Sequence, residues 1–320
     1  MSGEPPGFGL ELLPAADESP RCAVHSAELE VDPGGTAFWA DEVLVVDVPR
    51  PWPKPVWVAD DLTAVPDWVA AAGRSGRRVR VLAAVPRHRD ERRVVVYRRV
   101  PGRGEMHRTE HRCAPKSLIE VVAVLLVEGL DASPATVVDG EPPVRELMIC
   151  TQGSHDVCCG SRGTDFALEV AAARPDVEVR MVSHTGGHRF APTGITFPDG
   201  RMWGQIRLEE MFSILDREGR PSDVVSRCRG WTGVEGPGQI AERAVFAEVD
   251  GWWFDEVERT VAVEVDATGW RCLVGTHSQI WEVHVELGRA VPEIRCGQPG
   301  GGAAKPGVEY VVTEPPRVAL

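Results

Sequence analysis

Thiols and imidazoles are concentrated in two short segments near the middle of the chain. The segment CTQGSHDVCCG, residues 150–160, holds three cysteines and a histidine, and HTGGH, residues 184–188, holds two histidines around a Gly-Gly pair. Proteins use thiolate sulfur and imidazole nitrogen as ligands for zinc and for iron–sulfur clusters. The two segments are therefore candidates for the two halves of one metal site.

The predicted secondary structure places four of these side chains at one edge of a sheet. Residues 144–150 and 177–183 have the apolar patterns of strands, and residues 162–174 have the spacing of a helix between them. If the two strands are parallel neighbours, their carboxyl ends meet where open α/β sheets bind ligands. The four side chains expected to gather there as metal ligands are Cys150, Cys159, His184 and His188.

The spacing inside each segment limits the chemistry. Eight residues separate Cys150 from Cys159, which is too many for a redox-active Cys-x-x-Cys pair but enough for a loop that wraps a cluster. Gly186 and Gly187 disfavour a helix between the histidines and permit a tight loop. Their backbone N–H groups could approach the sulfur atoms of a cofactor, so we expect both glycines to contact it.

Two thiolates and two imidazoles leave three interpretations open. A tetrahedral Zn²⁺ site of the Cys₂His₂ type is common, and the spacing alone favours it slightly. A Rieske-type [2Fe–2S] cluster also takes two cysteines and two histidines. In the third interpretation no metal is bound, because Cys150 is a buried strand thiol and the histidines lie in solvated loops.

The other cysteines and the third histidine of this region are expected to be bystanders. Cys158 is a buried neighbour or a substitute ligand, and His155 is a solvated loop residue or a third imidazole. Small buried core residues are the ordinary interpretation of the five cysteines elsewhere. They are Cys22, Cys113, Cys228, Cys272 and Cys296. We therefore expect one metal site and no second cluster.

The length of 320 residues predicts more than one domain. Strand and helix patterns recur in the order β-α-β-β-α, which suggests two related α/β units with thioredoxin-like cores. We expect four regions: an irregular lead-in (1–35), a degenerate thioredoxin-like unit (36–135), the thioredoxin-like unit with the metal residues (136–250) and a small β-rich unit (251–320).

Composition and charge limit the classes of partner. The net charge of −13 argues against nucleic acid, although thirteen arginines stand against four acids between Arg74 and Arg112. These arginines either lie on solvent faces of strands or form a docking surface for an acidic redox partner. The sequence shows neither a secretory signal nor eighteen consecutive apolar residues, so we expect no membrane association and a cytoplasmic location. In such a reducing compartment, eight cysteines indicate metal or redox chemistry rather than disulfides.

The two metal-ligand segments resemble the sucrase/ferredoxin-like family of thioredoxin-like ferredoxins. The resemblance lies in CTQGSHDVCCG, SHTGGHRFAPTGITFPDGRMWGQI and GPGQIAERA, and it covers about residues 145–250, while the first α/β unit agrees in outline only. The shared frame is Cys-x8-Cys followed, after 24 residues, by His-x-Gly-Gly-His. This frame and the following Gly160 select Cys159 rather than Cys158.

The resemblance implies an electron carrier with a [2Fe–2S] cluster in the domain 136–250, held by the four predicted ligands. It also implies a redox partner protein, which the sequence does not identify. The alternative is a zinc-stabilised, thioredoxin-like binding module without a redox role. The name of the family suggests sugar hydrolysis as well, but this needs two carboxylates at a defined separation. The sequence points to no such pair, so we expect a carrier rather than a catalyst.

Overall fold

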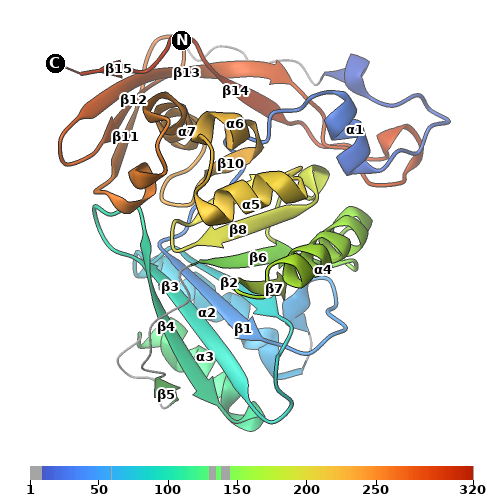
Figure 1. Cartoon of the computed structure of the whole chain (residues 1–320). Coiled ribbons are helices and arrows are strands. Elements are labelled where there is room, and N and C mark those ends of the chain that lie inside the picture. Colours follow the sequence, from blue (N-terminus) through green and yellow to red (C-terminus); the bar gives the residue numbers. More distant parts are fainter. Residues whose placement is uncertain (1–8, 59, 130–134, 138–144, 320) are drawn as a thin grey trace.

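The computed structural model describes residues 9–58, 60–129, 135–137 and 145–319 (Figure 1). Within them the fold is mixed α/β, as the sequence predicts. A ten-stranded mixed sheet is followed by a five-stranded antiparallel sheet. Residue 144, which was expected to begin a strand, lies outside the described residues.

The first half of the large sheet is built from the N-terminal part of the chain. Its elements are β1 (Glu42–Asp47), α2 (Val65–Arg74), β2 (Val79–Ala84), β3 (Arg92–Arg99), β4 (Met106–Cys113), α3 (Leu118–Val127) and β5 (Thr136–Val137). The strands lie in the order β2-β1-β3-β4-β5, with β1 and β2 parallel and the others antiparallel. β1 is Val or Leu at four of its six positions and is buried throughout, as strands covered on both faces are.

The second half repeats this arrangement. Its elements are β6 (Glu146–Cys150), α4 (Thr164–Ala173), β7 (Glu178–Val182), β8 (Thr193–Phe197), β9 (Arg201–Gly204), α5 (Leu208–Asp216), α6 (Pro221–Val224), β10 (Cys228–Trp231) and α7 (Pro237–Val249). The strand order is β7-β6-β8-β9-β10, and β6 and β7 are parallel. The order and directions of β7-β6-β8-β9 are therefore those of β2-β1-β3-β4 in the first half.

The two halves meet edge to edge and also face to face. β2 pairs with β7 at Ala84 and Val182, which joins all ten strands into one sheet. One face of each half packs on its own helices. The opposite faces share a third core, in which the rings of Tyr97 and Phe197 stack with centres 3.7 Å apart. The two halves thus form one continuous sheet and share one core.

The second sheet follows α7 along the chain. Its strands are β11 (Thr260–Val265), β12 (Trp270–Gly275), β13 (Ile280–Ala290), β14 (Val308–Val312) and β15 (Arg317–Val318). Figure 1 shows it across the top of the molecule with α7 beneath it, and α7 packs against β10 and β11–β14. None of the described helices combines the length and apolar character that a membrane span needs.

The structure contains elements that the sequence-based expectation did not include, among them α1 and β4. Residues 22–28, expected to be part of an irregular lead-in, form helix α1 (Cys22–Glu28). β4 was not expected, because the segment MHRTEHRC shows no alternation of apolar and polar residues. With β4 included, the first half has the order β-α-β-β-β-α instead of the predicted β-α-β-β-α. The second half has the same order as the first. The boundaries between the four predicted regions stay predictions.

Arginines of the basic segment join the two halves of the large sheet. Arg93 of β3 donates to Glu178 of β7 over 3.0 Å, and Arg108 of β4 donates to Glu146 of β6 over 2.8 Å. Both carboxylates and both guanidinium groups are largely shielded from solvent. At these two positions the arginines link the two halves of the sheet. They lie neither on a solvent face nor on a docking surface.

Candidate metal centre

The two predicted cysteine ligands lie at the two ends of the loop between β6 and α4. β6 ends at Cys150, and Cys159 opens a π-helical turn, Cys159–Gly163, that leads into α4. Such wide turns are found frequently at functional sites. The turn packs so closely on β6 that a Cβ atom at Gly163 would collide with the carbonyl oxygen of Cys150. Glycine at position 163 therefore allows Cys159 to lie beside the end of β6.

Three of the four predicted ligands come together at this edge of the sheet. The ligand atoms of Cys150, Cys159 and His184 lie within 4.8 Å of one another. Both cysteines are fully buried, and Nδ1 of His184 is buried without a hydrogen-bond partner among the described residues. Buried polar atoms are almost always paired, so an unpaired one calls for an explanation such as an ion. The three residues form a group that could hold a metal ion.

His188 lies beside this group but is not part of it. Its Nδ1 is 3.1 Å from Oδ2 of Asp156 and 3.2 Å from Sγ of Cys22. Its ring centre is 6.2 Å from that of His184. Histidine ligands commonly donate one ring N–H to a carboxylate and bind metal through the other nitrogen. The contact with Asp156 is compatible with that arrangement, and the role of His188 as fourth ligand stays a prediction.

His155 is not the solvated loop residue that the sequence favoured. Its ring stacks on that of His184 with centres 3.5 Å apart and planes inclined by 16°. Burial is the main reason that the pKa of His155 is lowered to about 4, and the neighbouring charge of His184 adds to it. A neutral imidazole therefore covers one face of the predicted ligand. The only sequence signal for this role was its position inside the loop from Cys150 to Cys159.

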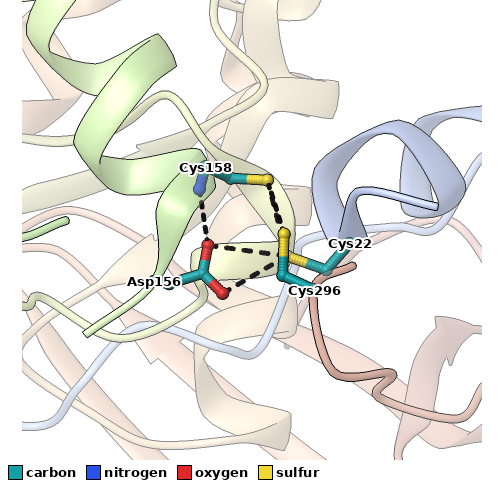
Figure 2. Close-up of side chains that lie close together, drawn as sticks. All are labelled: Cys22, Asp156, Cys158 and Cys296. Carbon is teal, nitrogen blue, oxygen red and sulfur yellow. Dashed lines mark hydrogen bonds between the residues drawn. The ribbon is translucent and has the colours of Figure 1, made fainter. Parts of the chain in front are cut away.

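A second group of potential ligands was not expected from the sequence. Cys22 of α1, Asp156 and Cys158 of the loop after β6, and Cys296 between β13 and β14 have ligand atoms within 4.8 Å of one another (Figure 2). We call these four residues the cysteine–aspartate cluster. Cys158 is a buried neighbour of Cys159, as predicted, and Cys22 is a buried core residue, as expected, but the sequence did not indicate that Cys22 and Cys296 lie next to Cys158. Both point at Cys158.

Comparison with known proteins gives the family of the chain. A sequence profile of the sucrase/ferredoxin-like family matches residues 37–230, more than half of the chain. The chain belongs to the sucrase/ferredoxin-like family. The match spans both halves of the large sheet, including the first half, which resembled the family only in outline by sequence. Neither the curated proteins nor the solved structures gave a significant match.

The surroundings of Cys150 in this family member favour its thiolate form. The thiol of Cys159 donates to Cys150, which lowers the pKa of Cys150 well below its ordinary value although burial opposes the shift. His184 and the backbone N–H of Thr185 lower it further. The same hydrogen bond raises the pKa of the donor, Cys159. The thiolate is the form that binds metals, so a lowered pKa favours metal binding at Cys150.

Two arginines that the sequence analysis did not single out lie close to Cys150. Nη1 of Arg229, in β10, donates to the carbonyl oxygen of Gly186 over 3.1 Å. Nη2 of Arg80, in β2, donates to that of His184 over 2.9 Å. Burial lowers the pKa of both arginines, while the charge of Cys150 raises it. No spacing rule links either arginine to the cysteines, so nothing in the sequence signalled this positive environment.

The Gly-Gly pair of the family frame accommodates the buried guanidinium of Arg229. Gly186 and Gly187 have φ angles of 83° and 64°, in the region that side chains other than glycine rarely adopt. A Cβ atom at Gly187 would lie 2.6 Å from Cζ of Arg229. The tight loop predicted from the pair is present. The contact of both glycines with a cofactor stays a prediction.

Gly187→Ala is expected to lower the free energy of unfolding by about 2–4 kcal/mol, because backbone strain adds to a collision with Arg229. Denaturant unfolding of the full chain measures this loss. Gly219→Ala is a matched control, since Gly219 has a φ of 69° but its Cβ would meet no atom closer than 4.0 Å. It should cost only the strain, about 1–2 kcal/mol. Equal losses in the two variants would contradict the proposed contact.

Proposed function

We propose that this protein is an electron carrier whose Rieske-like [2Fe–2S] cluster is held by Cys150, Cys159, His184 and His188. The observation that carries the proposal is the buried group of Cys150, Cys159 and His184, with ligand atoms within 4.8 Å of one another. Membership of the sucrase/ferredoxin-like family supports it. When bound, such a cluster supplies a one-electron redox couple.

The residues present fit this cofactor in their chemistry. Two thiols, one of them with a lowered pKa, and the unpaired buried Nδ1 of His184 are donors of the kind that a mixed cysteine–histidine cluster takes. We assign His188 as the fourth ligand from the His-x3-His spacing and from its position next to His184. The backbone N–H of Thr185, and by inference those of Gly186 and Gly187, would stabilise negative charge on sulfur.

The histidine side of the site is the side that a partner protein could approach. The side chain of His188 is 28% exposed, whereas both cysteines are buried. A cavity of about 640 Å³ opens there, lined in part by His155, Asp156 and His188. We infer that an unidentified redox protein docks over this cavity. In this arrangement the cysteines lie on the buried side of the cluster, and His188 faces the partner.

Two further inferences concern the setting of the site. We infer a thioredoxin-like core in each half of the large sheet, because both have a β-α-β unit followed by an antiparallel hairpin and a helix. We infer a reducing, cytoplasmic location, because all eight cysteines are free in the structure although several lie close together.

Anaerobic purification followed by metal analysis and spectroscopy tests the proposed function. We expect about two iron and two sulfide ions per chain, a reddish-brown colour lost on reduction with dithionite, and nitrogen couplings from two imidazoles in the reduced paramagnetic spectrum. A colourless protein with zinc in place of iron in the group of Cys150 would contradict the proposal. That result would instead support the zinc-stabilised binding module.

A further inference from the structure

The cysteine–aspartate cluster is assembled from three parts of the protein that are distant in the sequence. Cys22 belongs to α1, Asp156 and Cys158 to the loop that follows β6, and Cys296 to the segment between β13 and β14. Cys22 and Cys158 are almost completely buried, and Asp156 is 9% exposed. In Figure 2 the three sulfur atoms and the carboxylate point toward one common centre. None of these residues is among the ligands assigned to the iron–sulfur cluster.

We propose that the cysteine–aspartate cluster is a second metal site, which binds a thiophilic divalent cation such as Zn²⁺. Three thiolates and a carboxylate form a set of four ligands that Zn²⁺ accepts in tetrahedral geometry. The inference stands apart from the proposed function, because no residue is shared between the two ligand sets.

The distances between the donor atoms match the edges of such a tetrahedron. A zinc–sulfur bond of about 2.3 Å places two sulfur ligands about 3.8 Å apart, and a sulfur and an oxygen ligand slightly closer. Sγ of Cys158 is 3.7 Å from Sγ of Cys22 and 3.3 Å from Sγ of Cys296. Both carboxylate oxygens of Asp156 are 3.7 Å from Sγ of Cys22. A cation could therefore bind with only small movements of the side chains.

The surroundings also suit a bound cation. A buried carboxylate beside three thiols is unfavourable unless positive charge compensates it, and Zn²⁺ would deprotonate the thiols and neutralise much of the resulting charge. Asp156 has a second link as well, because its Oδ2 is 3.1 Å from Nδ1 of His188. This is the carboxylate–histidine contact that orients ligands around metal sites. The cavity of about 640 Å³ reaches Asp156 and Cys296, which provides a route of entry.

The proposed ion would have a structural role with an effect on the neighbouring site. It would tie α1 and the C-terminal sheet to the loop that carries Cys159. It would also hold Asp156, and through it the orientation of His188. This gives the lead-in and the C-terminal unit a common function, which is to fix the loop between β6 and α4.

The test is metal analysis of the full chain, expressed with iron and zinc and purified anaerobically. We expect about one zinc per chain, whose X-ray absorption shows three sulfur neighbours at about 2.3 Å and one oxygen at about 2.0 Å. Cys296→Ser and Cys22→Ser should each lower the zinc content about tenfold or more without lowering the iron content. Cys113→Ser is the matched control, because Cys113 is half-buried like Cys296 but belongs to neither group, and it should keep both metals.

Three results would overturn the second site. The first is a wild-type chain that contains less than about a tenth of an equivalent of zinc. The second is zinc that remains bound in Cys296→Ser and Cys22→Ser. The third is an intact mass of the anaerobic protein that shows a Cys158–Cys296 disulfide. The iron content reports separately on the first site. Zinc with two sulfur neighbours, lost in Cys150→Ser but not in Cys296→Ser, would contradict both proposals. A wild-type chain that contains iron but no zinc would contradict only the second metal site.

Discussion

Cys159→Ser is expected to lower the iron content about tenfold or more, whereas Cys158→Ser should leave it unchanged. The two cysteines are adjacent in the sequence, but their side chains belong to different groups. Cys159 lies with Cys150 and His184, and Cys158 lies with Cys22 and Cys296. A serine hydroxyl stays protonated at neutral pH and is a poor substitute for a thiolate ligand. Iron and sulfide analysis together with the visible spectrum measures the difference.

This pair of variants contains its own control, because the two positions share the same loop and both are buried. If the second metal site exists, the zinc content should change in the opposite sense, falling in Cys158→Ser and persisting in Cys159→Ser. Circular dichroism of both proteins shows whether each variant is folded. If folded Cys158→Ser lost its iron and Cys159→Ser retained it, Cys158 rather than Cys159 would be the cluster ligand.

Arg229→Met should lower the reduction potential of the cluster on the order of 50–100 mV. Reduction adds one negative charge to the cluster, and the buried guanidinium of Arg229 near Cys150 and Cys159 stabilises that charge. At an effective dielectric constant of about 20, two unit charges about 10 Å apart interact by 1–2 kcal/mol. For a one-electron couple this energy corresponds to the expected shift, since 59 mV equals a tenfold change. A spectroscopic redox titration of the purified protein measures it.

Arg229→Lys is the control for this prediction, because lysine keeps the positive charge but not the planar set of donors. Its potential should stay closer to that of the wild type. Both variants lose hydrogen bonds to Thr36 and to the carbonyl oxygen of Gly186, so both should be less stable. A potential that is unchanged in Arg229→Met, in protein that retains its iron, would show that the arginine acts only in packing.

Much of the candidate site follows from local sequence patterns. The predicted strands that end at Cys150 and before His184 are present as parallel neighbours, and this alone brings Cys150 close to His184. The Gly-Gly pair predicted a tight loop, which φ angles of 83° and 64° bear out. These features depend on periodicity and loop length over a few tens of residues. The sequence carries such information directly.

The long-range contacts could not be derived in this way. In the sequence, Cys150 and Cys159 belong to a recognisable spacing pattern, and the other cysteines look isolated. The fold nevertheless brings Cys22 and Cys296 close to Cys158. The environment of Cys150 likewise depends on Arg80, from the first half of the sheet, and on Arg229, from β10.

The sequence by itself therefore determined the α/β class, the family and the spacing of four candidate ligands. Only the tertiary structure decided which side chains surround them, that the rings of His155 and His184 stack, and that His188 contacts Asp156. The physical reason is that these contacts depend on how the two halves of the large sheet and the C-terminal sheet bury their faces against one another. Periodicity identifies a buried face, but it does not name the distant surface that covers it.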